Sequence, residues 1–243
     1  PVPTEEPSKF KGLVLRYRPA WNAESQSVNT VLFRAYTPEG LSVIDDETAP
    51  LNSATALDVV RAGLKAFTEM RKTELPMLFC LPLPVGAFST QALGEARELI
   101  AQIPRDARLG YLRLDLRRLP RANPEWLVAL RELFRSYVRG VTMPINPFTG
   151  IEAMLAIDHI SYVADVTRES DASDVEMFGV LLQLKSRAGA RAVAVTGLRK
   201  RGHLARAVSA GVAEVSGPAL MEESRHPPER VQRLPRESLM TVM

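Results

Sequence analysis

The chain has 243 residues, and its 31 Lys and Arg residues nearly balance its 28 Asp and Glu residues, leaving a formal net charge of +3. Hydrophobic residues make up 46% of the chain, which excludes global disorder. The single cysteine, Cys80, excludes an internal disulfide and a multi-cysteine zinc site. No apolar run is long enough to span a membrane, and the first residues lack the pattern of a signal peptide. We therefore expect a cytoplasmic domain without membrane insertion.

Both ends of the chain differ in composition from the rest. Residues 1–10 are rich in Pro and Glu, as is typical of a linker, and residues 221–243 combine three prolines with many charges. We expect residues 11–220 to form the folded domain. Residues 221–243 should form a polar, proline-rich tail with a short helix that could serve in docking or dimerisation. Because the sequence opens on a linker-like segment without Met, we expect a C-terminal part of a longer protein, which could be membrane-anchored.

The first third of the domain begins with two strands and a helix. Alternating apolar residues predict strands over residues 13–17 and 28–35, joined by a polar turn over residues 22–27. Apolar residues at three- and four-residue spacing predict a helix over about residues 54–70. A short apolar run over residues 76–83 predicts a buried strand. Because the first turn has the length of a hairpin, the first two strands should be antiparallel.

The rest of the domain alternates between helices and strands. Apolar residues from Leu93 to Ile103 predict an amphipathic helix, followed by a strand over residues 110–116. Asn123 and Pro124 are favourable for the start of the next helix, which Gly140 should end. The remaining predicted elements are strand 141–145, a short helix at about 149–156, strand 160–166, a helix at about 173–188, strand 191–196, helix 201–209 and strand 211–216.

This alternation indicates the fold class. Strands separated by helices predict a parallel sheet with crossover helices, and therefore an α/β fold. The eight predicted strands fit a (β/α)8 barrel over roughly 210 residues. An open doubly wound sheet is the alternative. The hairpin at the start departs from a regular barrel, because its two strands would be antiparallel.

In such a barrel, a catalytic site would lie at the C-terminal ends of the strands. Among the predicted strand ends, only Asp115 and Asp165 contribute carboxylates. A divalent-metal site for phosphoryl chemistry needs several converging oxygen ligands. No Ser-His-Asp set and no glycine-rich phosphate loop is visible either. We therefore expect neither a metal nor another cofactor.

Six phrases of the sequence follow one another in the order, and nearly at the spacing, of the motifs of a known family. They are YRP at residues 17–19, VNTVLFR at 28–34, LRLDL at 112–116, GVTMPINPFTG at 140–150, VAVTGLR at 193–199 and GVAEVSG at 211–217. They resemble the YQPI, EALLR, ExxE-type, DDFGTG, AEGVE and GCDxxQG motifs of the EAL domain family, the cyclic di-GMP phosphodiesterases. The resemblance implies an EAL-type modified (β/α)8 barrel, similar to the TIM barrel, with an antiparallel first strand.

The residues that carry the chemistry of the family differ in this sequence. Only Asp115 keeps an acid, one methylene shorter than the glutamate of the family. Arg34 keeps the arginine that the family uses near a ligand phosphate. The altered positions are Thr30 for the glutamate of EAL, Cys80 or Leu81 for a metal-binding asparagine, Asn146 and Pro147 for two aspartates, Ala164 for a lysine, Thr196 and Arg199 for the two glutamates of AEGVE, and Ser216 for a glutamine.

These losses bear directly on catalysis. The catalysis of the family rests on two divalent ions. Because nearly all of the residues that would bind them are altered here, the resemblance implies a degenerate domain that is not an enzyme. Arg199 at a former carboxylate position would also repel a cation. For Asp115, a polar group satisfied by the arginines around it is the alternative to a residual metal ligand. For Arg34, a structural salt bridge is the alternative to a phosphate contact.

We expect a catalytically inactive EAL-like domain that acts as a regulatory protein-interaction module in bacterial signal transduction, with protein partners or a homodimer. The alternative is a metal-independent receptor for cyclic di-GMP or another nucleotide, with Arg34, Asp115 and Arg199 as candidate ligand-binding residues. A weakly active phosphodiesterase is the third hypothesis. The aromatic content of 6% and the small net charge disfavour a nucleic-acid polymer as the partner.

Overall fold

The structure, a computed structural model, describes residues 12–45, 51–119, 124–148, 160–169, 171–189 and 192–240. The expected linker over residues 1–10 and the expected short helix at 149–156 lie outside the described residues.

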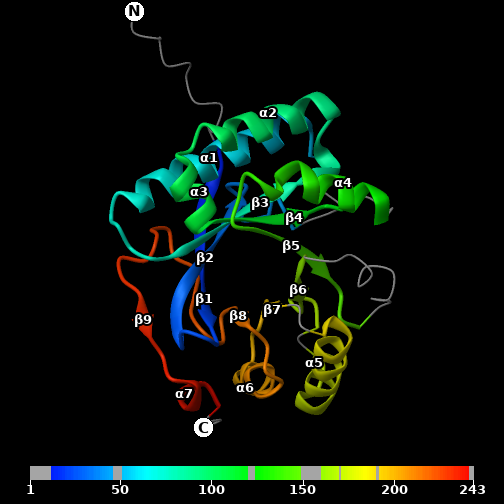
Figure 1. The fold of residues 1–243 in the computed structure, drawn as a ribbon. Helices are drawn as coiled ribbons and strands as arrows, with labels where there is room; N and C mark the ends of the chain where they lie inside the picture. Colours follow the sequence, from blue (N-terminus) through cyan, green and yellow to red (C-terminus); the bar gives the residue numbers. More distant parts are fainter. Residues whose placement is uncertain are drawn as a thin grey trace, which may run out of the picture.

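Strands β1 to β8 close into a barrel (Figure 1). Strand β1 is antiparallel to both of its barrel neighbours, β2 and β8, and all other neighbours in the barrel are parallel. This confirms the predicted barrel with an antiparallel first strand. The bounds are β1 Val14–Asn22, β2 Ser27–Tyr36, β3 Leu78–Pro84, β4 Leu112–Arg117, β5 Gly140–Ile145, β6 Ser161–Asp165, β7 Val193–Thr196 and β8 Glu214–Ser216.

The helices cover the outside of the barrel on two opposite sides (Figure 1). Helices α1 Ser53–Arg71, α2 Thr90–Ala101, α3 Arg105–Tyr111 and α4 Pro124–Arg135 lie on one side, and α5 Asp174–Ala188 and α6 Arg201–Ser209 lie on the other. A single 3-10 turn, η1 Val85–Ala87, follows β3. The side chains of Asn52 and Ser89 accept hydrogen bonds from the first turns of α1 and α2, and Ser173 forms a capping box at α5. None of the described helices is long and apolar enough to cross a membrane.

The apolar core lies mainly between the barrel and these helices. One cluster, which includes Phe33, Phe67 and Phe79, packs beneath α1, α2 and α4. A second, which includes Trp21 and Tyr162, packs beneath α5 and α6. Inside the barrel, the apolar cluster consists of Ala20, Leu32 and Cys80. Barrel interiors are usually filled by bulky branched residues. Because this interior cluster is small, polar side chains such as Arg113 and Glu214 occupy much of the remaining space.

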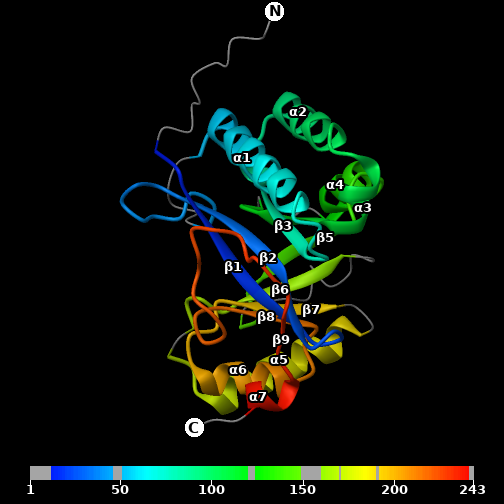
Figure 2. The same cartoon turned by 90° about the vertical axis from the view of Figure 1, so that its left-hand side faces the viewer.

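Residues 221–240, here called the C-terminal segment, run along the β1–β2 hairpin (Figure 2). The segment contains β9 Gln232–Arg233, antiparallel to β2, and the short helix α7 Arg236–Met240. The Trp21 indole N–H donates to the Leu234 carbonyl at 2.7 Å, and Leu239 is buried in the cluster beneath α5 and α6. The predicted short helix is therefore present, and the segment packs on the barrel.

Candidate functional site at the barrel mouth

Three arginine and aspartate side chains of β4 project into the barrel. Successive side chains of a strand alternate between its two faces, so Arg113, Asp115 and Arg117 share the interior face. Asp115 and Arg117 are buried, with 1% and 4% of their surface exposed. Buried ionised groups are stable only when they are paired and hydrogen-bonded. The partners of these two residues therefore define the chemistry of the mouth.

The guanidinium of Arg117 lies among three carboxylates. Its Nε and Nη2 donate to Oδ2 of Asp115 at 2.9 and 2.7 Å. Its Nη1 lies 3.3 Å from Oδ1 of Asp45 and 3.3 Å from Oδ2 of Asp165. Burial alone would lower the pKa of Arg117, but the three acids, Asp115 foremost, raise it. Arg117 is thus a permanent cation at the centre of this group.

Arg34 on β2 comes within reach of the same carboxylates. Its side chain is fully buried, with Nη1 3.6 Å from Oδ2 of Asp115 and Nε 3.6 Å from Oδ2 of Asp45. Nη1 also donates to the Phe33 carbonyl at 3.0 Å. Both Nε and Nη2 are buried without a hydrogen-bond partner among the described residues. Arg34 is therefore neutralised by the acids but is not fully hydrogen-bonded.

Asp45 reaches the mouth from the loop after β2. Arg118 adopts a left-handed backbone conformation, with φ of 51°, and its Nη2 and Nε donate to the Val43 and Ile44 carbonyls at 2.9 and 3.3 Å. These bonds hold the loop over the mouth. Burial would raise the pKa of Asp45, but Arg34 and Arg117 beside it hold that pKa at about 2.

Glu223 reaches the mouth from the C-terminal segment. Its Oε1 accepts from Arg18 Nε at 2.6 Å, and its Oε2 accepts from the Tyr36 hydroxyl at 2.8 Å. Arg18 also donates through Nη1 to Thr196 Oγ1 at 3.1 Å. Burial and the Glu223 carboxylate raise the pKa of Tyr36 to about 12. We call these side chains together the mouth network: Arg18, Arg34, Tyr36, Asp45, Asp115, Arg117, Asp165 and Glu223.

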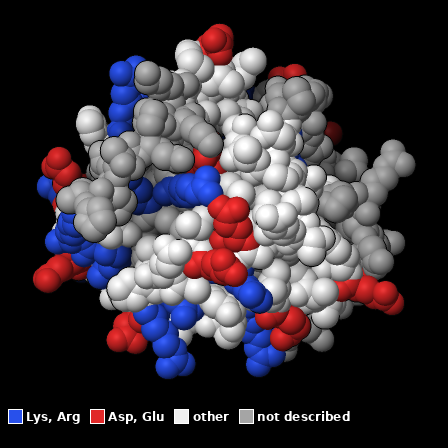
Figure 3. Space-filling model, turned by 90° about the horizontal axis from the view of Figure 1, so that it is seen from above, with Lys and Arg blue, Asp and Glu red and all other residues white. Residues whose placement is uncertain are grey.

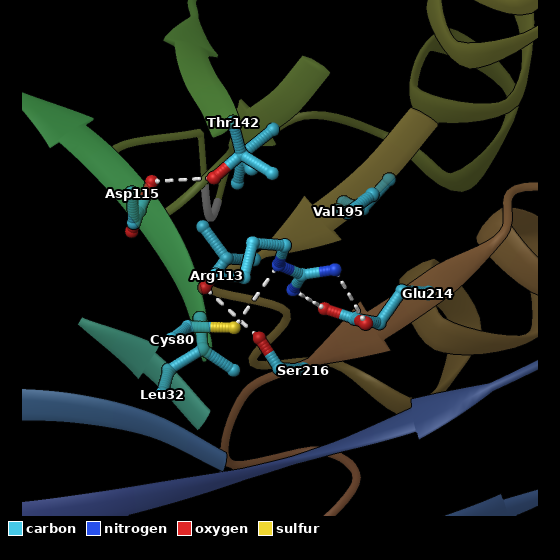
Figure 4. A pocket seen from close by; sticks show the side chains of 11 residues that line it. Leu32, Cys80, Arg113, Asp115, Thr142, Val195, Glu214 and Ser216 are labelled. Carbon is cyan, nitrogen blue, oxygen red and sulfur yellow. Dashed lines mark hydrogen bonds and ion pairs between the residues drawn. The ribbon is translucent and has the colours of Figure 1, made fainter. Parts of the chain in front are cut away.

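Deeper in the barrel, a second ion pair fills the interior (Figure 4). Arg113 Nη2 and Nη1 donate to the two carboxylate oxygens of Glu214 at 2.6 and 3.2 Å, and its Nε donates to Cys80 Sγ at 3.1 Å. Thr142 Oγ1 donates to Asp115 Oδ1 at 3.2 Å and so joins the two layers. The cavity among these side chains measures about 10 Å³, enough for about one water molecule.

The structure brings together two of the three predicted site residues. Arg34 and Asp115 meet in the mouth network, and Asp115 is a polar group satisfied by Arg117 and Thr142. Arg199 is exposed in the loop after β7, and no ion pair joins it to the mouth network in the described part of the chain.

The altered motif positions also have defined surroundings. Thr30 is fully buried, and its hydroxyl lies 3.4 Å from Oδ1 of Asn29. Oδ1 of Asn146 accepts from the backbone N–H of Phe148 at 2.8 Å, so this oxygen is already used in a turn. On β6, Ala164 packs in the outer cluster, whereas Val163 lines the interior cavity. The interior position of this strand is therefore Val163, and Ala164, which was matched to the family's lysine, faces the outer cluster.

Several members of the mouth network were not predicted. Arg117 could have been found, because it lies two residues after Asp115 on the same strand face. Asp45 and Glu223 could not, because a loop and the C-terminal segment carry them and neither has a regular pattern. Arg18 lies beside Tyr17 in the YRP phrase, but only the contact with Glu223 shows its role.

Divalent ions do not fit this site as it is built. Asp45, Asp115 and Asp165 already share the Arg117 guanidinium, which is itself a cation. No group of three or more His, Cys, Asp and Glu side chains among the described residues could hold a metal ion. A divalent ion beside Arg117 would meet like charge in a poorly solvated interior.

No protein-family model and no curated protein matches the sequence. Solved structures with a similar fold include the EAL domain of DcpA from Mycobacterium smegmatis, with a TM-score of 0.65 and 13% identity over 87% of this chain and 92% of that one. The EAL domain of FimX from Xanthomonas citri, in complex with cyclic di-GMP, has a TM-score of 0.58 and 15% identity over 90% of both chains. YkuI from Bacillus subtilis, a protein with an EAL domain solved with its substrate cyclic di-GMP and calcium, has a TM-score of 0.68 and 13% identity over 91% of this chain and 58% of that one. The chain therefore has the fold of the EAL domains, as its sequence motifs predicted.

Proposed function

We propose that this chain is a catalytically inactive EAL-like domain that acts in the cytoplasm as a regulatory protein-interaction module in bacterial signalling. The observation that carries the proposal is the position of Arg117 among Asp45, Asp115 and Asp165. In metal-dependent phosphodiester hydrolysis, divalent ions neutralise phosphate charge and lower the pKa of a bound water. A guanidinium supplies positive charge, but it coordinates no water and generates no hydroxide.

A turnover assay tests the loss of catalysis. The full chain is incubated with cyclic di-GMP and either magnesium or manganese, beside an active phosphodiesterase as positive control. We expect no linear product and no free nucleotide. We also expect neither metal to raise the melting temperature, because an ion that binds the native state would stabilise it by mass action. Turnover that depends on the added metal would contradict the proposal.

Surface features support the interaction role. Val175 and Leu182 of α5 are 75% and 43% exposed and lie seven residues apart, on one face of the helix. Seen from the side of α1 and α2, the surface interleaves acidic and basic side chains around uncharged areas (Figure 3). Such a mixture suits a protein partner or a second copy better than a nucleic-acid polymer, which requires a continuous basic surface.

A paired variant tests this role. The double variant Val175→Glu, Leu182→Glu should reduce partner capture or self-association in sedimentation and pull-down measurements, while its melting temperature stays near that of the wild type. Arg199→Gln, at another exposed site, serves as the control that should retain both. If the double variant associates as the wild type does, α5 is not the interaction surface.

A receptor for cyclic di-GMP is the second candidate, and the state of Arg34 favours it. Two of its nitrogen atoms are buried without hydrogen-bond partners, so they would donate to an anionic oxygen of a ligand that opened the mouth network. The FimX and YkuI structures contain cyclic di-GMP. Calorimetry with cyclic di-GMP, with and without magnesium, tests this function. Binding heat that is independent of magnesium would favour it, and no heat at high micromolar ligand would remove it.

A further inference from the structure

The barrel is incompletely paired on one side of its first strand. Strand β1 extends over nine residues, but β8 has only three and pairs with β1 at Ala20, Trp21 and Asn22 alone. Residues 14–19 of β1 therefore have β2 on one side and no barrel strand on the other. In the described part of the chain, the pairing on that open side is a single bridge between Tyr17 and Ser224.

The open side presents backbone groups that can accept another strand. Tyr17 donates its N–H to the Ser224 carbonyl at 2.8 Å and accepts from the Ser224 N–H at 3.0 Å. Backbone groups alternate in direction along a strand, so the N–H and C=O of Leu15 face the same side as those of Tyr17. Leu15 is half-buried. A strand edge of this kind is a template for an added strand.

The C-terminal segment shows how such an added strand is held. Ser224 makes the two backbone bonds to Tyr17, and the preceding residue, Glu223, places its carboxylate on Arg18 and Tyr36. Two consecutive residues thus hold the segment: Ser224 by main-chain hydrogen bonds and Glu223 by its carboxylate. Arg16 lies on the same strand face as Arg18, which adds a second cation along this edge.

We propose that the open edge of β1, residues 13–17, is a docking site for an extended acidic segment of a partner protein, which adds a strand there by displacing residues 222–225 of the C-terminal segment. The partner segment carries a Glu or Asp that takes the place of Glu223 on Arg18 and Tyr36, and apolar residues that alternate with it and face Leu13 and Leu15. This proposal rests on the proposed interaction function, and it names the surface and the chemistry of the partner.

Binding of a model segment tests the proposal. The probe is a labelled synthetic peptide, ALMEESRVTV, added to the full chain. It keeps residues 219–225 and places Val, Thr and Val where the chain has His226, Pro227 and Pro228, so that the two valines can face Leu15 and Leu13. The variant Glu223→Gln weakens the charged anchor of the chain's own segment, and Glu222→Gln, an exposed neighbour, is the matched control. The peptide should bind the Glu223→Gln chain about tenfold tighter than the wild type or the control. A peptide whose own second Glu is changed to Gln should bind less.

Amide exchange measured by NMR decides where the peptide binds. In the Glu223→Gln chain, the amides of Tyr17 and Ser224 should exchange about tenfold faster than in the wild type. The bound peptide should then protect Leu15 and Tyr17. Unchanged exchange in the Glu223→Gln chain would overturn the proposal, as would faster exchange without peptide protection of Leu15. Dimerisation of that chain at micromolar concentration would also overturn it, in favour of a second copy as the occupant. Turnover of cyclic di-GMP would contradict the proposed function without altering these results.

Discussion

The guanidinium of Arg117 makes the mouth network sensitive to a single substitution. Arg117→Met keeps much of the side-chain volume and removes the cation that two hydrogen bonds join to Asp115. The buried Asp115 carboxylate then keeps the Thr142 hydrogen bond, and its remaining ion pair is with Arg34 at 3.6 Å. We therefore expect a loss of about 3 kcal/mol in the free energy of unfolding, measured with urea. Arg199→Gln should stay within about 0.5 kcal/mol of the wild type.

The same reasoning predicts a rescue. Adding Asp115→Asn to Arg117→Met should recover part of the lost stability, because the buried charge is removed together with its partner. If Arg117→Met alone unfolds at the same urea midpoint as the wild type, the ion pair with Arg117 does not stabilise Asp115. The electrostatic account of the mouth network would then be wrong.

The lowered pKa of Asp45 predicts that the stability of the protein falls at acid pH. Its folded pKa of about 2 lies below its ordinary value of 3.8, so its contribution is complete above about pH 4 and is lost as the pH falls toward 2. The difference in pKa corresponds to at most about 2–3 kcal/mol. Urea unfolding between pH 5 and pH 2 should therefore show a smaller stability loss for Asp45→Asn than for the wild type. Equal losses in the two proteins would mean that Arg34 and Arg117 do not hold this carboxylate.

The sequence located Asp115 as a carboxylate on a predicted strand, and Arg34 through the resemblance of residues 28–34 to a motif of the EAL domain family. The acids that complete the site lie outside such patterns. Asp45 belongs to a loop that Arg118 holds, and Glu223 belongs to a polar segment whose position depends on backbone hydrogen bonds. Main-chain pairing leaves little trace in residue type, so contacts of this kind cannot be predicted from one sequence.

At the scale of elements, the end of β8 depends on a close approach at Gly217. Its φ is 142°, and a Cβ there would lie 2.4 Å from both the backbone N and O of Leu198. That approach accompanies the hydrogen bond from the Leu198 N–H to the Ser216 carbonyl at 3.2 Å, which joins the ends of β7 and β8. We expect Gly217→Ala to lower the free energy of unfolding by about 2 kcal/mol or more.

A second glycine provides the control for this prediction. Gly94 lies within α2, and a Cβ there would meet no heavy atom within 4 Å. Gly94→Ala should therefore raise stability by about 0.5–1 kcal/mol through helix propensity. Thermal melting of both variants checks the pair. A tolerated Gly217→Ala would show that the turn after β8 can rearrange without separating the two strands.

The strands and long helices could be predicted because each buries a periodic apolar face. Helix α6, for example, spans the predicted residues 201–209. Helix α3 was missed because it has seven residues and none of them is buried, so no apolar period marks it. The path of the C-terminal segment was missed because Trp21 and Leu239, far apart in the sequence, supply its main side-chain contacts.

At the scale of the whole molecule, the barrel closes around its single cysteine. Cys80 is 1% exposed, packs with Ala20 and Leu32 inside the barrel, and lies below the mouth network. Burial raises the pKa of its thiol to about 12, so the reactive thiolate is scarce in the folded state. A thiol reagent should therefore modify Cys80 only when the barrel opens, and the labelling rate should report the population of the open state.

The labelling rate of Cys80 also measures the stability loss that we expect for Arg117→Met. If closing is fast relative to labelling, the loss of about 3 kcal/mol expected for Arg117→Met should accelerate modification of Cys80 by about 150-fold under native conditions. Arg199→Gln should leave the rate near that of the wild type, and denaturant should make all three proteins react at the same rate. Rapid labelling of the native wild type would instead mean that solvent reaches the interior through the mouth, without unfolding. The mouth network would then not seal the barrel, and Arg117→Met would change the rate far less than it changes stability.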